Sequence, residues 1–208
     1  MILQTIAVGP LDVNCYIIAD DITRKGILID PGGDAEKIKK ALQTEKITLS
    51  NIIITHGHWD HVGAVIDIKK AYDCPICLHK DDLEVYAHAQ DIALIFGFEI
   101  ESPPEIDSFI DDSDVLYAGK IALKALHTPG HTRGSISLST DGIVFTGDLI
   151  FKGGVGRTDF PGGDEEMLKK SIKSRIFTMP DDTLIYPGHG FPTTVIEERN
   201  TNPFLCDY

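Results

Sequence analysis

The strongest chemical signal in the chain is a short run of imidazole and carboxylate side chains, His56-Gly57-His58-Trp59-Asp60-His61. With eight histidines in 208 residues, this H-x-H-x-D-H arrangement is expected by composition alone in roughly one chain in a thousand. Imidazole nitrogens and a carboxylate crowded into six residues suit zinc, iron or manganese. The alternative, a polar turn with solvated histidines, does not account for that rarity.

Three further groups have the same character and lie far apart along the chain. His131 stands in a Thr-Pro-Gly-His-Thr turn, Asp148 ends an apolar segment, and His189 stands in Pro-Gly-His-Gly. Each follows apolar residues that read as a strand, and each is held by glycine or proline. Any one of them alone would be an ordinary loop or capping residue. Together with the first cluster they complete a set of nitrogen and oxygen ligands that contains no thiolate.

Two more residues, Asp30 and Arg157, each allow two interpretations. Asp30 ends an apolar strand before Pro31, so it either supports a metal ligand from behind, as carboxylates often do for bound histidines, or is a turn residue. Arg157 follows a glycine-rich segment. Its guanidinium either holds a substrate carboxylate or pairs with Asp159.

The elements that must position these residues alternate between strand and helix, which is typical of an α/β or layered α+β fold. Apolar runs predict strands at residues 13–19, 26–30, 51–55, 76–79, 121–126, 135–139, 143–146 and 183–186. Asp34 and Asp164 are predicted to cap helices at their N-termini, and helical periodicity also covers residues 62–72 and 81–98. The segments 26–32 and 142–148 echo one another, which fits two similar halves. No linker interrupts the chain, so residues 1–208 are predicted to form one domain.

Composition narrows the functional classes. Hydrophobic residues make up 42% and charged residues 25%, and the formal charge is −13. Such a surface repels nucleic acid and anionic membranes. No apolar run reaches the roughly 20 residues that span a bilayer, and no secretory signal is recognisable. With four cysteines, these features predict a cytoplasmic protein, while its oligomeric state is not indicated.

The motifs taken together resemble a known family, the metallo-β-lactamase-fold hydrolases. Within it they resemble the glyoxalase II-like (hydroxyacylglutathione hydrolase-like) branch, in a compact form without the C-terminal helical domain. The motifs that carry the resemblance are THGHWDH at 55–61, TPGHT at 128–132, FTGD at 145–148, GRTDF at 156–160 and PGHG at 187–190. They occur in the family's order and spread over most of the chain.

The resemblance implies a four-layer αββα sandwich with two divalent metal ions per chain at one edge. Zinc is the first choice, with iron or manganese as alternatives. The first ion would be bound by His56, His58 and His131. The second would be bound by Asp60, His61 and His189, with Asp148 as the bridge. Asp60 and Asp148 would thereby also be the catalytic carboxylates.

The resemblance further implies hydrolysis of small acyl thioesters by metal-bound hydroxide, with S-D-lactoylglutathione as the leading substrate. No protein nucleophile is then required, in agreement with the absence of a G-x-S-x-G motif. Two other functions stay open. One is a persulfide dioxygenase with a single iron, which residues 156–160 also resemble. The other is a metal-binding module without catalytic activity.

Overall fold

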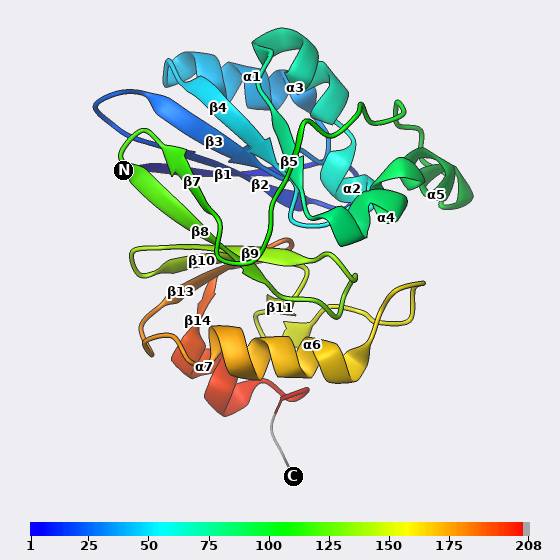
Figure 1. The fold of residues 1–208 in the computed structure, drawn as a ribbon, viewed down its shortest axis with the longest axis vertical. Coiled ribbons are helices and arrows are strands. Elements are labelled where there is room, and N and C mark those ends of the chain that lie inside the picture. The colour runs from blue at the N-terminus through cyan, green and yellow to red at the C-terminus, as the bar shows by residue number, and fades with distance from the viewer. Residues whose placement is uncertain (206–208) are drawn as a thin grey trace.

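The computed structural model describes residues 1–205, and Cys206 lies outside this range. Two six-stranded sheets face one another, with helices on the outer face of each (Figure 1). Helices α1 (Ala35–Thr44) and α3 (Val65–Tyr72) cover the first sheet, and α6 (Glu165–Ser171) and α7 (Val195–Thr201) cover the second (Figure 1). The predicted four-layer αββα sandwich is confirmed.

The first sheet has the order β1-β2-β3-β4-β5-β6. Its first three strands pair antiparallel, and the strands from β3 to β6 pair parallel. The parallel strands therefore end at one edge of the sheet. The six strands are β1 (Ile2–Val8), β2 (Val13–Ala19), β3 (Lys25–Ile29), β4 (Thr48–Ile53), β5 (Ile76–Leu78) and β6 (Ser108–Phe109).

The second sheet has the order β14-β13-β10-β9-β8-β7. Only β10 and β13 run parallel, and the other pairs are antiparallel. The strands are β7 (Val115–Ala118), β8 (Ile121–His127), β9 (Ile136–Thr140), β10 (Ile143–Gly147), β13 (Leu184–Pro187) and β14 (Thr193–Thr194). Two further strands, β11 (Ile150–Phe151) and β12 (Gly154–Val155), pair with one another in a separate hairpin. The two segments with similar sequences, 26–32 and 142–148, contain most of β3 and β10. Each of these strands is third in the spatial order of its sheet as given above.

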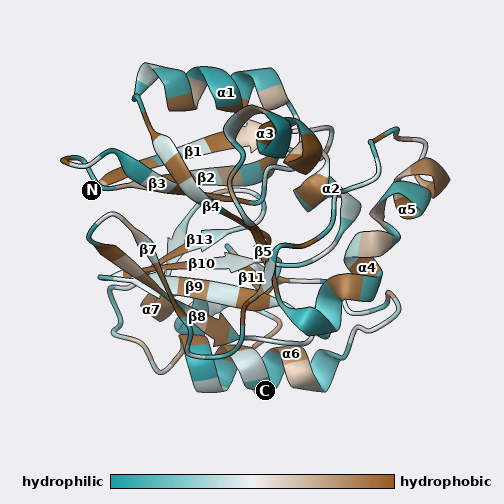
Figure 2. Ribbon diagram, turned by 45° about the horizontal axis from the view of Figure 1, so that its top comes forward, coloured by the Kyte–Doolittle hydropathy of each residue, from teal (hydrophilic) through white to brown (hydrophobic). Residues whose placement is uncertain are grey.

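Three apolar layers hold the sandwich together, and β2 contributes to two of them. Cys15 and Ile17 face the helices on the first sheet, whereas Tyr16 and Ile18 face the second sheet. Because side chains alternate along a strand, a strand buried on both faces reads as one continuous apolar run. The third layer lies between the second sheet and α6 and α7. The outer helices carry both hydrophilic and hydrophobic residues, as α1 and α6 show in Figure 2.

The helices differ in detail from the sequence prediction. The pattern over 62–72 is divided between α2 (Trp59–Val62) and α3, and the pattern over 81–98 forms η1 (Lys80–Asp82), α4 (Leu83–Ala87) and α5 (Ala89–Ile95). Asp164 caps α6 by accepting the Met167 N–H, and a π-helical turn, η2 (Ile172–Ile176), extends α6. Asp34 does not cap α1 with its side chain. No helix within residues 1–205 is both long and apolar enough to cross a membrane.

Candidate metal centre

The loops after four strands bring the predicted ligands to one edge of the sandwich. β4 leads into residues 56–61, here called the histidine turn. β8 leads into the loop with His131, β10 into Asp148, and β13 into the loop with His189. All seven predicted ligands meet there, although up to 133 residues separate His56 from His189. Four of the seven, His56, Asp60, His61 and His131, are buried. His58 and Asp148 are partly buried, and His189 is 27% exposed at its side chain.

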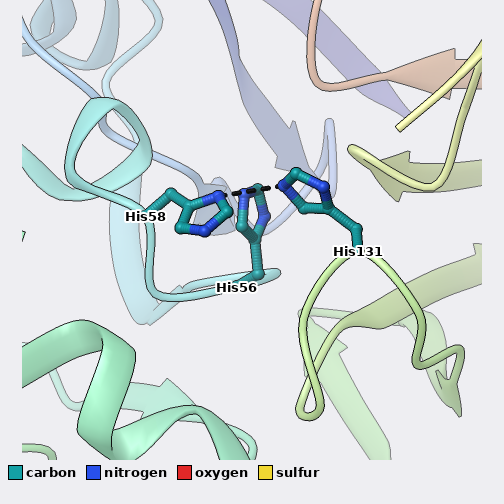
Figure 3. Close-up of side chains that lie close together, drawn as sticks. All are labelled: His56, His58 and His131. Atoms are coloured by element: carbon teal, nitrogen blue, oxygen red, sulfur yellow. Dashed lines mark hydrogen bonds between the residues drawn. The ribbon is translucent and has the colours of Figure 1, made fainter. Parts of the chain in front are cut away.

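His56, His58 and His131 form the first group, with their potential ligand atoms within 4.8 Å of one another. The three rings converge from the histidine turn and the β8–β9 loop (Figure 3). His58 Nδ1 lies 2.9 Å from His131 Nε2. Nitrogens that share one tetrahedral ion at 2.0–2.1 Å would lie about 3.4 Å apart. A small shift of either ring would therefore admit an ion between them.

Asp60, His61 and His189 form the second group. His189 Nε2 lies 3.3 Å, and His61 Nε2 3.7 Å, from Asp60 Oδ2. Asp148 lies between the two groups, since its Oδ2 is 3.7 Å from His131 Nε2 and 3.6 Å from His189 Nε2. A carboxylate in this position can contribute an oxygen to each of the two groups.

Hydrogen bonds fix the orientation of most of these rings. Nδ1 of His61 lies 2.9 Å from Asp30 Oδ2, that of His131 lies 2.7 Å from the Arg157 carbonyl, and that of His189 lies 3.0 Å from the Leu11 carbonyl. Each contact places a proton on Nδ1 and directs an Nε2 lone pair into the centre. Histidines that bind metals are typically held in this way.

Unpaired polar atoms test whether the residues fit a metal. Among the described residues, three buried side-chain atoms have no hydrogen-bond partner, namely His56 Nε2, His61 Nε2 and Asp148 Oδ1. Buried polar atoms are ordinarily paired, and unpaired ones call for an explanation. All three belong to the candidate ligand set, and divalent ions bound there would satisfy them together. The donor set therefore fits divalent cations.

The protonation states also suit metal ligands. Burial, reinforced by neighbouring histidines, lowers the pKa of His56 well below its usual value, and burial beside His131 lowers the pKa of His58 to about 3. Burial opposes the charge on Asp148, yet the nearby His61 holds the pKa of that carboxyl well below its usual range. For His61 burial is outweighed by three carboxylates, Asp148 first, which raise its pKa. A divalent ion would replace that proton as their counter-charge.

Asp30 contacts the site from behind. Its carboxylate accepts the Thr55 N–H at 2.7 Å and the Thr55 hydroxyl at 2.6 Å, and contacts His61. Its φ of 49° lies in the left-handed region, a backbone conformation that costs energy for a residue other than glycine. Asp30 thus fixes both the start of the histidine turn and the ring of His61.

Arg157 reaches the site through its backbone. Its carbonyl contacts His131, whereas its guanidinium forms two 2.7 Å hydrogen bonds to Asp159 and lies 3.8 Å from the centroid of the Phe160 ring. The pairing with Asp159 is therefore the arrangement found, and contact with substrate stays a prediction. The Phe160 ring, 5.7 Å from that of His58, gives the site an apolar side.

Sequence reasoning missed two residues of β2 that hold the His189 loop. Asn14 donates its amide to the carbonyls of Pro187, at 3.0 Å, and Gly190, at 2.9 Å. The Tyr16 hydroxyl also donates to the Pro187 carbonyl, at 2.6 Å. An asparagine inside a buried apolar strand was the available signal, because buried amides need partners.

A second cluster, His79, Asp81 and His127, also brings potential ligand atoms together. Its two imidazoles stack with centroids 4.2 Å apart and planes inclined by only 10°. Ring nitrogens donate within the plane of the ring, so two nearly parallel stacked rings cannot aim at one ion. His127 also contacts the Arg133 carbonyl, at 2.9 Å. This geometry favours a packing role for both rings.

Residues 8–189 match the family model of the metallo-beta-lactamase superfamily. The chain belongs to this superfamily. One relative within it is the hydroxyacylglutathione hydrolase GloC of Haemophilus influenzae, which is 36% identical over 99% of this chain and 98% of its own length. The similarity therefore extends over nearly the whole of both proteins.

Two solved superfamily structures are closely similar. The BLEG-1 B3 metallo-beta-lactamase superposes with a TM-score of 0.90 at 32% identity, covering 99% of this chain and 100% of that one. TTHA1623, solved in a di-iron-bound form, also gives a TM-score of 0.90, at 38% identity, covering 97% and 100%. The superfamily fold is thus shown, and zinc is not the only metal to consider.

Proposed function

We propose that this superfamily member is a dinuclear metallohydrolase that cleaves small acyl thioesters, with S-D-lactoylglutathione as the leading substrate. The observation that carries the proposal is the convergence of seven nitrogen and oxygen ligands in two groups, with the Asp148 carboxylate between them. The similarity to a hydroxyacylglutathione hydrolase over nearly full length supports the substrate class.

The chain supplies orientation and charge for this chemistry. Divalent ions at the centre would lower the pKa of a bound water to about 7 and stabilise negative charge on a carbonyl oxygen. The chain's own carboxylates, Asp60 and Asp148, offset only part of the charge of two dications, so the centre favours an electron-rich carbonyl. Because a thiolate is a good leaving group, no strong general acid is required at the sulfur.

The side chains around the centre bear on which thioester is bound. Phe160 lies beside His58, and Phe96 lies 6.1 Å from Phe160 between ring centroids. They offer an apolar surface to an acyl or thiol group. Arg133 is exposed two residues after His131. Because the guanidinium of Arg157 is already paired with Asp159, Arg133 is a second candidate to attract a substrate carboxylate.

The proposal is tested by elemental analysis of the purified protein alongside two assays, thioester hydrolysis with lactoylglutathione and oxygen uptake with glutathione persulfide. We expect about two metal ions per chain and hydrolysis without oxygen uptake. One iron per chain with oxygen uptake would instead establish the persulfide dioxygenase. Bound metal without turnover of any activated thioester would indicate a non-catalytic module and overturn the proposal.

A further inference from the structure

We propose that Asp82 is a positioning residue for the metal centre, because one buried carboxylate holds both loops that carry the first group of ligands. This inference rests on the proposed metal-binding function. It concerns a residue outside the ligand set, from a helical turn that contributes no ligand.

The geometry is specific. Asp82 is the last residue of η1 and is fully buried. Its Oδ2 accepts the Gly57 N–H at 2.7 Å, and its Oδ1 accepts the Gly134 N–H at 2.8 Å. Gly57 stands between the ligands His56 and His58, and Gly134 follows the ligand His131 by three residues. Each oxygen thus secures one loop.

Both loops lie directly against the helical turn. A Cβ at Gly57 would come within 2.5 Å of the Tyr86 backbone nitrogen, and one at Gly134 within 2.5 Å of the Asp82 backbone nitrogen. These approaches admit only glycine without a shift of the backbone. The two loops are therefore pressed onto the η1–α4 segment, and the carboxylate fixes their position along it.

A charged acceptor has a particular advantage here. Hydrogen bonds from a backbone N–H to a carboxylate are stronger than those to a neutral oxygen, and a carboxylate offers two acceptor oxygens. An asparagine of the same shape would present an oxygen to one loop and an amide N–H to the other. One ligand loop would then lose its acceptor, and displacement of a ligand by even about 1 Å weakens a site that depends on fixed geometry.

Asp20 provides a matched control. It is 3% exposed, and it accepts the N–H groups of Ile22, Thr23 and Lys120 at 2.8, 3.0 and 2.9 Å. It therefore also joins two turns through one carboxylate. Val13, at the start of β2, pairs with His189, whereas Asp20 follows the other end of the strand. At about 3.3 Å per residue, the length of β2 places Asp20 about 20 Å from the candidate centre.

The experiment compares the wild type with Asp82→Asn and Asp20→Asn. Zinc affinity is measured by competition with a chromophoric chelator, and thermal unfolding and amide hydrogen exchange are measured on the metal-free proteins. We expect both variants to lower the melting temperature. Only Asp82→Asn should weaken zinc binding at one of the two sites by about tenfold or more, and speed exchange in residues 55–61 and 130–135.

The outcomes separate this inference from the proposed function. If the wild type binds no zinc, the metal-binding function itself fails. If the wild type binds two ions and Asp82→Asn binds both as tightly, the positioning role is wrong. Should Asp82→Asn fail to fold, exchange in the wild type decides, since the Gly57 and Gly134 amides must both be protected in the metal-free protein. Rapid exchange of either amide overturns the inference.

Discussion

At the scale of single residues, the centre depends on which nitrogen each imidazole presents. His61, His131 and His189 each turn Nδ1 toward an oxygen outside the centre and leave Nε2 facing inward. His58 differs, because its Nδ1 is the atom that faces His131. The site therefore combines two ring orientations, which gives five imidazoles and two carboxylates room around two points.

Replacement of the central carboxylate should have the largest effect of any single change. Asp148→Asn keeps the shape but removes a negative charge and one acceptor oxygen from between the two groups. The ions would repel one another more, and one should bind weakly. We expect thioester hydrolysis to fall at least about a hundredfold, with about one ion per chain by elemental analysis.

The control for this change is His127→Asn, at the last residue of β8 and four residues before the candidate ligand His131. His127 stacks on His79 and lies outside the ligand set, so we expect it to cost less than about threefold in activity. Equal losses in the two variants, or full activity and two bound ions in Asp148→Asn, would mean that the bridge is assigned to the wrong residue.

At the scale of elements, three of the four loops that carry candidate ligands are held by an element that carries none. β2 holds the loop of His189 through Asn14 and Tyr16, and the η1 turn holds the two loops of the first group through Asp82. Loops that follow strands are mobile when nothing packs on them. These contacts keep the ligands in place before any ion is bound.

Asn14→Ala tests the support of the His189 loop. It removes one buried and one partly buried hydrogen bond and leaves the carbonyl of Gly190 without that donor. We therefore expect the free energy of unfolding to fall by about 1–3 kcal/mol. Affinity for the ion held by Asp60, His61 and His189 should fall, while the other ion stays bound. Chemical denaturation and zinc titration measure the two effects. Loss of both ions together would show that β2 supports the whole centre instead.

Asp20→Asn tests a pH dependence remote from the centre. Backbone N–H groups, that of Thr23 first, lower the pKa of Asp20 to about 2, below the value near 3.9 of an unfolded aspartate. A depressed pKa stabilises the fold above about pH 4 and ceases to do so as the pH falls toward 2. The difference in melting temperature between wild type and variant should be constant from pH 7 to about 4 and shrink below it. A constant difference down to pH 2 would contradict this.

The helices and strands show which features can be predicted from the sequence and which cannot. The buried strand at residues 13–19 and the cap at Asp164 were predicted correctly, because continuous apolar runs and capping residues are local signals. The helix predicted over 62–72 is broken because Ala64 donates its N–H to the Pro31 carbonyl, a contact between distant segments. α7 was missed although Thr194 caps it by accepting the Glu197 N–H, a signal that Thr-x-x-Glu carries.

The same distinction, between local sequence signals and contacts between distant segments, applies to the candidate centre. The candidate ligands could be named from the sequence because histidines two or three residues apart are rare, and the structure brings these side chains together. That they bind metal stays a prediction. The supports could not, since the Leu11 and Arg157 carbonyls are backbone atoms whose residue type is irrelevant. Asp82 was likewise hidden, because nothing local distinguishes it from its neighbour Asp81.

At the scale of the whole molecule, the two echoing strands take equivalent places. β3 and β10 each run parallel to one neighbour and antiparallel to the other. Asp30 follows the first and Asp148 follows the second. Each sheet thus delivers one carboxylate to the shared edge, the first behind His61 and the second between the ligand groups. The centre lies where the two halves meet, so metal binding should stabilise the sandwich as a unit.

Metal removal tests that link between the centre and the fold. Binding to the folded state alone stabilises it by about 2.7 kcal/mol per site at a free ion concentration a hundredfold above Kd. For a domain of this size, 1 kcal/mol moves the melting temperature by about 2–4 °C. Chelation should therefore lower the melting temperature by roughly 10 °C or more, but the three apolar layers should keep the protein folded at 25 °C.

Calorimetry and circular dichroism before and after chelation measure this effect, with re-addition of zinc to show that it reverses. His56→Ala is the internal comparison, because it removes a ligand of the first group only. It should bind about one ion fewer and show a correspondingly smaller drop on chelation. Loss of all structure at 25 °C on chelation would mean that the metals are needed for folding itself. An unchanged melting temperature would mean that the folded protein binds no ion, and would contradict the proposed metal centre.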